Sequence, residues 1–191
     1  MNWILASQSP RRKELFGLFR VPFTVQVADI DETMDANQNP ADEVARVSRL
    51  KAFAVSRTEE DVIIAADTIV VCDGKTLGKP KDKADAKSML TVLSGRKHQV
   101  MTGVTVLHGN DCDTFTEITE ISFRPLSEKE IDAYIATGEP MDKAGSYGIQ
   151  GGAALFATGI AGDYYNVMGL PVCRLWHSLN RMVGQALEET L

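Results

Sequence analysis

Two adjacent arginines stand where a helix is expected to begin, in the stretch ILASQSPRRKELF at 4–16. Ser9 is a plausible N-cap, and Pro10 suits the first helical position. Cations are disfavoured there, because the helix dipole already presents positive charge at its N-terminus. Arg11 and Arg12 offer planar, bidentate donors for phosphate oxygens, and the free N–H groups of a helix start also favour anions. The stretch therefore indicates a phosphate site, although a solvated basic turn would have the same composition.

A single carboxylate interrupts the apolar, β-branched run VIIAADTIVV at 62–71. The run is typical of a central strand, on which Asp67 shares a face with Ala65 and Ile69, and Thr68 belongs to the other face. A carboxylate on a central strand has to be paired, hydrogen-bonded or metal-bound, because its unpaired burial is costly. We interpret Asp67 as a functional residue; the alternative is a strand-end aspartate bonded to the backbone.

Two lysines are further candidates. Lys51 lies on an expected helix over 40–55, near the apolar face of that helix, where a snorkelling lysine is the alternative interpretation. Lys79 lies in LGKPKD, which fails as a P-loop because its glycine spacing is one residue short and a proline replaces the required Ser or Thr. The following proline holds Lys79 in an extended conformation.

Two loop segments could also contact a ligand. Asp29, Asp31 and Glu32 form an acidic run that either supplies oxygen ligands to Mg²⁺ or is a solvated loop. The segment GEPMDKAGSYGIQGGAA at 138–154 contains several glycines, which let the backbone approach a ligand closely. Within it, the amide of Gln150 could read the edge of a base; the alternative is a loop rich in turns.

The elements that would position these residues alternate between strand and helix patterns. Strands are expected at 2–6, 22–28, 62–71, 98–107 and 114–124, and a hairpin within AALFATGIAGDYYNV. Helices are expected at 10–19, 40–55 with Asn39 as its cap, 83–93, from the Ser127–Glu130 capping box to 138, and 172–188. Asp73-Gly74 signals a tight turn. We predict one α/β domain over 1–191, a mixed sheet with flanking helices arranged as two lobes around a cleft.

Composition narrows the class of protein. With 44% hydrophobic and 24% charged residues, the 191-residue chain is typical of a soluble globular protein, and it has no membrane-spanning run and no signal-peptide pattern. Three scattered cysteines without a CxxC pair fit a reducing cytoplasm, and three unclustered histidines argue against zinc. A net charge of −6 and a pI near 5.1 argue against binding to a nucleic-acid backbone. A polyanion would have to meet a local cluster of cations, which is a small-ligand arrangement.

Six segments, taken together and in order, resemble the Maf family of nucleotide pyrophosphatases: LASQSPRRKEL, AADTIV, GKP, LSGRKHQVMTGV, GEPMDKAGSYGIQG and GDYYNVMGLP. The resemblance implies a fold similar to that of inosine triphosphate pyrophosphatases, with the site in the cleft. It also implies hydrolysis of a nucleoside triphosphate to the monophosphate and pyrophosphate with Mg²⁺ or Mn²⁺, and a homodimer. SPRR together with KAGSYGIQG resembles the subgroup that acts on dTTP and UTP, and modified pyrimidine nucleotides are further candidate substrates.

Carried over position by position, the resemblance implies three groups of site residues. The proton acceptor is Asp67, which with Glu32 would also hold the metal. The residues that set substrate preference are Arg11, Thr68 and Gln150. The residues expected to contact phosphates are Ser9, Arg12, Lys51 and Lys79. Attack of water at the α-phosphorus needs neutralised phosphate charge and a positioned, deprotonated water, and these side chains supply both.

Two alternatives stay open. The family's name comes from an association with septum formation, so the chain could bind nucleotide as a regulator of cell division without essential turnover. A carboxylate set beside the cations favours the enzyme, because a pure binder has no need of Asp67. The second alternative keeps the enzyme and makes a damaged purine nucleotide its substrate.

Overall fold

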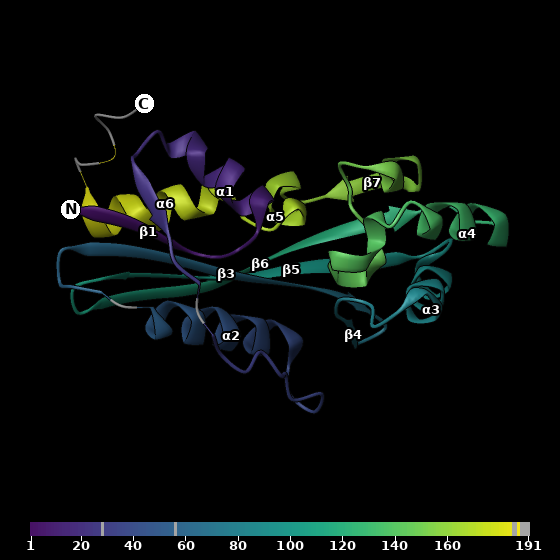
Figure 1. The fold of residues 1–191 in the computed structure, drawn as a ribbon, viewed down its shortest axis with the longest axis horizontal. Coiled ribbons are helices and arrows are strands. Elements are labelled where there is room, and N and C mark those ends of the chain that lie inside the picture. The colour runs from purple at the N-terminus through teal and green to yellow at the C-terminus, as the bar shows by residue number, and fades with distance from the viewer. Residues whose placement is uncertain (28, 56, 185–186, 188–191) are drawn as a thin grey trace. The chain divides into compact units, whose positions relative to one another are not determined.

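The computed structural model describes residues 1–27, 29–55, 57–184 and 187, and within them it confirms the predicted mixed α/β fold (Figure 1). The strands are β1 (Asn2–Ala6), β2 (Phe23–Val25), β3 (Asp61–Cys72), β4 (Lys75–Leu77), β5 (Lys97–His108), β6 (Asp111–Phe123) and β7 (Ala157–Ala161). The helices are α1 (Pro10–Phe16), α2 (Pro40–Ala54), α3 (Lys83–Leu93), α4 (Glu128–Ala136), α5 (Tyr164–Met168) and α6 (Val172–Val183).

The strands pair in the order β2-β1-β3-β5-β6-β7, with β4 on β3. β1 runs parallel to both β2 and β3, whereas β4 is antiparallel to β3 and β7 is antiparallel to β6. The sheet is therefore mixed, as predicted. β3 is buried along its length except at the half-buried Asp67 and Thr68, which explains why its sequence is otherwise largely apolar and β-branched.

The chain divides into two compact units. The first unit comprises Met1–Asp67, Thr102–Glu117 and Gly169–Leu191, and the second comprises Thr68–Met101 and Ile118–Met168. The long strands β3, β5 and β6 contribute residues to both units. Two units agree with the predicted two lobes, and the cleft stays a prediction.

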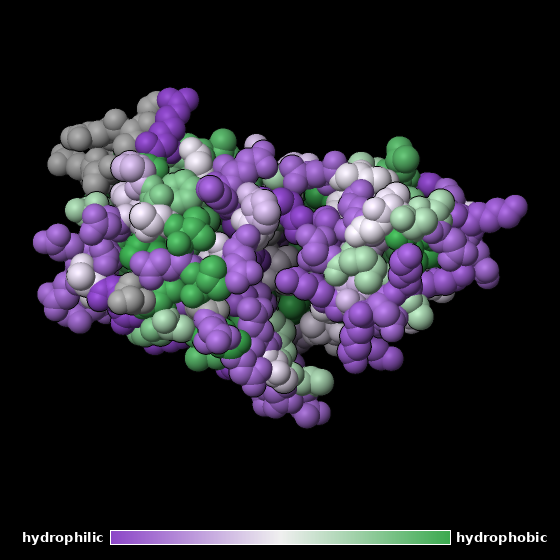
Figure 2. All heavy atoms as spheres, in the orientation of Figure 1, coloured by the Kyte–Doolittle hydropathy of each residue, from purple (hydrophilic) through white to green (hydrophobic). Residues whose placement is uncertain are grey.

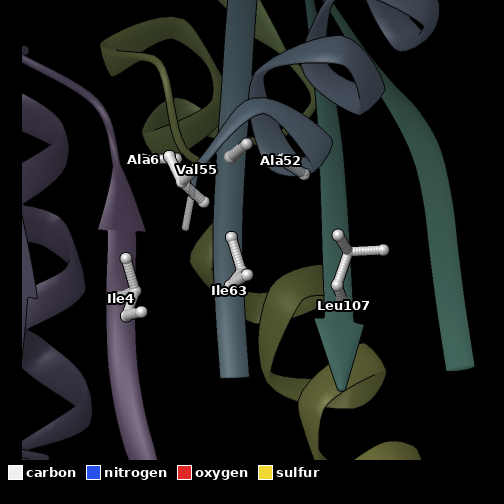
Figure 3. Packing of buried hydrophobic residues seen from close by; sticks show 7 residues of the cluster. Ile4, Ala6, Ala52, Val55, Ile63 and Leu107 are labelled. Carbon is white, nitrogen blue, oxygen red and sulfur yellow. The ribbon is translucent and has the colours of Figure 1, made fainter. Parts of the chain in front are cut away.

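In the first unit, helices cover both faces of the strands. α1 and α6 lie on one side and α2 lies on the other (Figure 1). Ile4, Ile63 and Leu107 come from three strands and form a buried apolar cluster with Ala52 of α2 and Val55 just after it (Figure 3). Burial of these groups holds α2 against the sheet, and α2 is the helix that carries Lys51.

A glycine lets α2 approach the sheet closely. A Cβ added to Gly103 of β5 would lie 2.4 Å from the carbonyl oxygen of Val44 in α2, so no larger residue fits unless the backbone moves. Asn39 caps the helix as predicted, its side chain accepting a hydrogen bond from the Ala41 N–H at 2.9 Å.

In the second unit, α3 and α4 pack against each other, and β3 and β4 form an antiparallel hairpin. Asp73 and Gly74 both have positive φ, 49° and 72°, as the predicted tight turn requires. The predicted capping box is also confirmed: Glu130 N–H donates to the hydroxyl of Ser127, and the Glu130 carboxylate accepts from the Ser127 N–H.

The predicted hairpin within AALFATGIAGDYYNV is wrong. The segment forms a 3-10 turn over Gly152–Leu155, one strand, β7, on the edge of β6, and the short helix α5. The Asp163 carboxylate accepts hydrogen bonds from the N–H groups of Tyr165 and Asn166, which starts a helix where a second strand was expected.

Several other element bounds differ from prediction; β6, for example, begins at Asp111 and not at 114. β2 covers only Phe23–Val25 of the expected 22–28, and α1 ends at Phe16, followed by a 3-10 turn over Gly17–Phe19. α6 ends at Val183, before Gly184 with its positive φ of 51°; of the rest of the expected helix, 185–186 and 188 lie outside the described residues. Polar side chains cover most of the face in Figure 2, and in the described part of the chain no helix is long and apolar enough to cross a bilayer.

Candidate active site

The first unit brings Arg12 close to Asp67 and Glu32. α1 starts as predicted: Ser9 caps it by accepting a hydrogen bond from the Arg12 N–H at 3.4 Å, and Pro10 is its first residue. Ser7 directly follows β1 and is buried. Its hydroxyl accepts a hydrogen bond from the Ser9 N–H at 3.2 Å. The strand–loop–helix connection is thus fixed by side-chain hydroxyls.

Arg12 is anchored by the protein itself. Its Nε donates to the carbonyl oxygen of Gly169 at 2.8 Å, and its Nη1 donates to the hydroxyl of Ser7 at 3.4 Å. Burial lowers the pKa of the Arg12 guanidinium, whereas the negative charges of Asp67 and Glu32 raise it. Both carboxylates are therefore close enough to stabilise the cation, which stays protonated at neutral pH.

Lys51 connects the two predicted acidic residues. Its ammonium donates to Asp67 Oδ1 at 2.7 Å and forms an ion pair with Glu32 Oε2 at 2.9 Å. The Lys51 side chain is only 11% exposed and that of Asp67 13%, whereas that of Glu32 is 54% exposed. The snorkelling alternative is therefore wrong: Lys51 sits on the buried face of α2 with its charge directed at carboxylates.

Asp67 is the last residue of β3 in the first unit, and its ion pair explains how a carboxylate is tolerated on this strand. Alanines at 65 and 66 precede it on the strand, and both are fully buried. The Lys51 ammonium compensates the charge of this poorly solvated carboxylate. The alternative of an aspartate bonded only to backbone is wrong.

The donor set fits a hard divalent cation. Glu32 and Asp67 each place one oxygen within 3 Å of the same ammonium, so two carboxylates approach one position of positive charge. Mg²⁺ is commonly held by one or two carboxylates together with substrate phosphates. Within the described residues no group of three or more His, Cys, Asp or Glu side chains is placed to hold a metal ion.

Three predicted site residues belong to the second unit. Thr68 is half-buried and follows Asp67 along β3, and Lys79 is exposed in the loop after β4, before the buried Pro80. Gln150 is exposed in a turn between Gly148 and Gly151. Their roles in substrate binding stay predictions.

Two features of the structure could not be predicted from local residue patterns. The Gly169 carbonyl that holds Arg12 is 157 positions away along the chain, and nothing local marks it. His98, in the second unit, is buried with its Nε2 2.8 Å from the Tyr147 hydroxyl, and burial lowers its pKa to about 4. Its position among aromatic rings, edge-on to Phe123 and Tyr147, indicates a core residue and not a ligand.

Comparison with known proteins finds matches over nearly the whole chain. The family model described as Maf-like protein matches residues 2–182. A protein of Bacillus cytotoxicus named dTTP/UTP pyrophosphatase is 54% identical over 181 residues, which cover 94% of this chain and 95% of that relative. A protein of Bacillus pumilus with the same name is 53% identical over 172 residues, covering 90% and 91%.

Solved structures are more distant. A HAM1 protein from Coxiella burnetii aligns over 95% of this chain and 99% of its own, with 12% identity and a TM-score of 0.49. The Ham1 protein of Staphylococcus aureus aligns over 64% and 72%, with 15% identity and a TM-score of 0.46. TM-scores below 0.5 decide nothing about function. The family match over nearly the whole length, with relatives above half identity, is decisive: the chain belongs to the Maf-like protein family.

Proposed function

We propose that this protein hydrolyses nucleoside triphosphates, dTTP and UTP in particular, to the monophosphate and pyrophosphate. The observation that carries the proposal is the Lys51 ammonium held between Glu32 and Asp67, with the Arg12 guanidinium in electrostatic range of both carboxylates. The relatives named dTTP/UTP pyrophosphatase support the choice of substrate.

The cations would neutralise the triphosphate. Arg11 and Arg12 present guanidinium groups from neighbouring positions on α1, and Lys51 adds an ammonium from α2. A phosphoryl-transfer transition state carries negative charge on its oxygens, and preorganised cations stabilise that charge without reorganising. Ser9 and Lys79 complete the proposed phosphate contacts on the basis of the family resemblance.

Asp67 would accept the proton of the attacking water. The water oxygen forms a bond to the α-phosphorus, the bond from that phosphorus to the bridging oxygen breaks, and pyrophosphate leaves. The Lys51 hydrogen bond fixes the position of the Asp67 carboxylate on the rigid strand β3, which lets its second oxygen receive the proton.

Glu32 and Asp67 would also hold a divalent cation, Mg²⁺ or Mn²⁺. When bound, such a cation supplies positive charge at the phosphate oxygens. The exposed Glu32 carboxylate is the more accessible of the two, because its side chain is four times as exposed as that of Asp67.

Base selection is assigned to other residues. We propose that Gln150 reads the uracil or thymine edge, because its amide offers both a donor and an acceptor. The family resemblance adds Thr68 and Arg11 to the residues that set substrate preference.

Product analysis across a nucleotide panel tests the proposal. The purified protein is incubated with dTTP, UTP, CTP, purine triphosphates and modified pyrimidine nucleotides, with Mg²⁺ and with Mn²⁺ in parallel. The expected products are pyrophosphate and monophosphate, released fastest from dTTP and UTP. Nucleoside diphosphate and orthophosphate as primary products would contradict the proposed bond cleavage, and binding without any turnover would favour the regulator. Light scattering after gel filtration tests the predicted homodimer.

A further inference from the structure

Gln150 projects from a short turn that the protein holds at both ends. The carbonyl oxygen of Gly148 accepts a hydrogen bond from the Gly151 N–H at 3.0 Å, which closes the turn around Ile149 and Gln150. Ile149 is buried at 8% exposure, while Gln150 is exposed. The buried Ile149 thus anchors the turn in the second unit, and the exposed Gln150 presents its amide to the outside.

Tyr134 and Glu139 make the hydrogen bonds that hold the turn. The Gly148 N–H donates to the Tyr134 hydroxyl at 3.0 Å, and that hydroxyl donates to Glu139 Oε1 at 2.8 Å. The second carboxylate oxygen, Glu139 Oε2, accepts from the Gly152 N–H at 3.0 Å. A continuous chain of hydrogen bonds therefore joins the residue before the turn to the residue after it.

The glycines on either side of Gln150 leave room for the side chains of Glu139 and Lys143. A Cβ added to Gly151 would lie 2.1 Å from Glu139 Oε1, and one added to Gly148 would lie 2.8 Å from the Cε of Lys143. Side chains at these positions would push the carboxylate and the lysine away. The glycines therefore serve the packing of Glu139 against the turn, in addition to any approach of a ligand.

Both holding residues are themselves fixed. The Tyr134 ring is 5% exposed and lies edge-on to Phe156, with ring centroids 5.1 Å apart. Burial raises the pKa of the Tyr134 hydroxyl, so it remains a proton donor at neutral pH. Lys143 Nζ donates to the main-chain oxygen of Glu139 at 2.7 Å, which fixes the backbone from which the carboxylate extends.

We propose that Tyr134 and Glu139 are positioning residues for base selection, because they fix the orientation of the turn that presents Gln150. The inference rests on the proposed function, in which Gln150 reads the base. Without the hydrogen bonds from the Gly148 N–H to Tyr134 and from the Gly152 N–H to Glu139, the turn samples other orientations. Selecting the orientation that binds the base then lowers the affinity for dTTP and UTP. Nucleotides whose base Gln150 does not recognise lose nothing.

Three variants of the full chain test this inference: Tyr134→Phe, Glu139→Gln and Glu139→Ala. Tyr134→Phe removes only the hydroxyl, and Glu139→Gln keeps an acceptor for one donor. We expect KM for dTTP and UTP to rise about five- to tenfold in Tyr134→Phe and Glu139→Ala, the size of one lost hydrogen bond, with kcat unchanged. Kinetic constants for CTP and ATP should stay as in the wild type, and Glu139→Gln should recover part of the selectivity.

Glu130→Ala is the matched control. Glu130 is also a carboxylate of the α4 region that accepts hydrogen bonds from backbone and side chain, in its case from Ser127 and Arg124. Its removal should lower stability without changing the ratio of kcat/KM for UTP to that for CTP. If the control changed this ratio as much as Glu139→Ala does, general loosening of the unit would explain the effect and the inference would be overturned.

A double variant and amide exchange complete the test. In Gln150→Ala, adding Glu139→Ala should cause no further loss of selectivity, because the orientation of an absent amide does not matter. Exchange measured by NMR should accelerate at the Gly148 N–H in Tyr134→Phe and at the Gly152 N–H in Glu139→Ala.

The possible failures are distinguishable. Absence of pyrophosphate release by the wild type would reject the proposed function. Normal activity with selectivity unaffected by Gln150→Ala would reject base reading and this inference with it. Selectivity lost in Gln150→Ala but kept in both Tyr134→Phe and Glu139→Ala would overturn the positioning role alone.

Discussion

At the scale of single residues, Asp67 is a poorly exposed carboxylate on a central strand, where Lys51 compensates its charge. Replacing it with Asn keeps the shape of the side chain and an acceptor for Lys51, but removes the proton acceptor of the proposed reaction. We expect Asp67→Asn to lose turnover by at least about a hundredfold, with folding and nucleotide binding largely kept. Pyrophosphate release and nucleotide titration measure the two properties separately. Hydrolysis at the wild-type rate by the folded variant would remove Asp67 from the mechanism.

Gln150 belongs to the same scale but to a different property. Losing a hydrogen-bonding partner for the base costs on the order of 1–3 kcal/mol when a polar group of the substrate is left unpaired. Gln150→Ala should therefore raise KM for dTTP and UTP and narrow their advantage over CTP and purine triphosphates. The measurement is kcat/KM for each nucleotide with both proteins. An equal fall for every nucleotide would show that Gln150 acts on the phosphates or the architecture.

Residue type and position were enough to single out Arg12 and Asp67, because each is a charge in a place that disfavours an unpaired one. Lys51 was equally consistent with a snorkelling side chain, and the family resemblance added it to the site. The groups that pair with Lys51 and Arg12 in the structure could not be predicted from residue type. Glu32 lies in a segment without regular structure, and its pairing with Lys51 depends on how that segment folds back on α2. The Gly169 carbonyl that anchors Arg12 has no side chain to signal it.

At the scale of elements, the close contact between α2 and β5 fixes where Lys51 stands. Gly103→Ala would place a Cβ 2.4 Å from the Val44 carbonyl oxygen, and a backbone atom cannot move aside as a flexible side chain can. We expect a loss of about 1–3 kcal/mol in the free energy of unfolding, together with reduced kcat/KM because α2 carries Lys51.

Gly17→Ala is the control for this prediction. A Cβ at Gly17 meets nothing within 4 Å, and its φ of −59° suits any residue, so the change should stay within about 0.5 kcal/mol. Urea unfolding of the three proteins gives the comparison. Equal stability of Gly103→Ala and the wild type would mean that α2 and β5 tolerate a wider separation.

Most strands and helix starts could be predicted from the sequence, whereas the type of element after residue 152 could not. The strands β1, β3, β5 and β6 followed from β-branched and apolar runs, and Asn39 and the Ser127–Glu130 pair marked helix starts. The hairpin was expected there because Tyr164, Tyr165 and Val167 favour a strand by propensity, and that expectation was wrong. The Asp163 carboxylate overrides that propensity by accepting the first N–H groups of α5.

At the scale of the whole molecule, buried His98 couples stability to pH. Its pKa is lowered from 6.5 to about 4 by burial, so the folded protein favours the neutral imidazole beside Tyr147. Above pH 6.5 both states are neutral at this residue and stability is complete. Between pH 6.5 and about 4 the unfolded chain binds a proton at this residue that the folded chain does not. The free energy of unfolding therefore decreases as the pH is lowered, by roughly 3 kcal/mol at most.

Urea midpoints at pH 7, 5.5 and 4.5 measure this decrease, and His98→Gln should remove most of it. A variant with the same pH dependence as the wild type would place the effect on other titratable groups. Glu43 and Glu130, whose pKa values are lowered from 4.5 to about 2, lose their contribution in a more acidic range and would not explain a fall above pH 4.5.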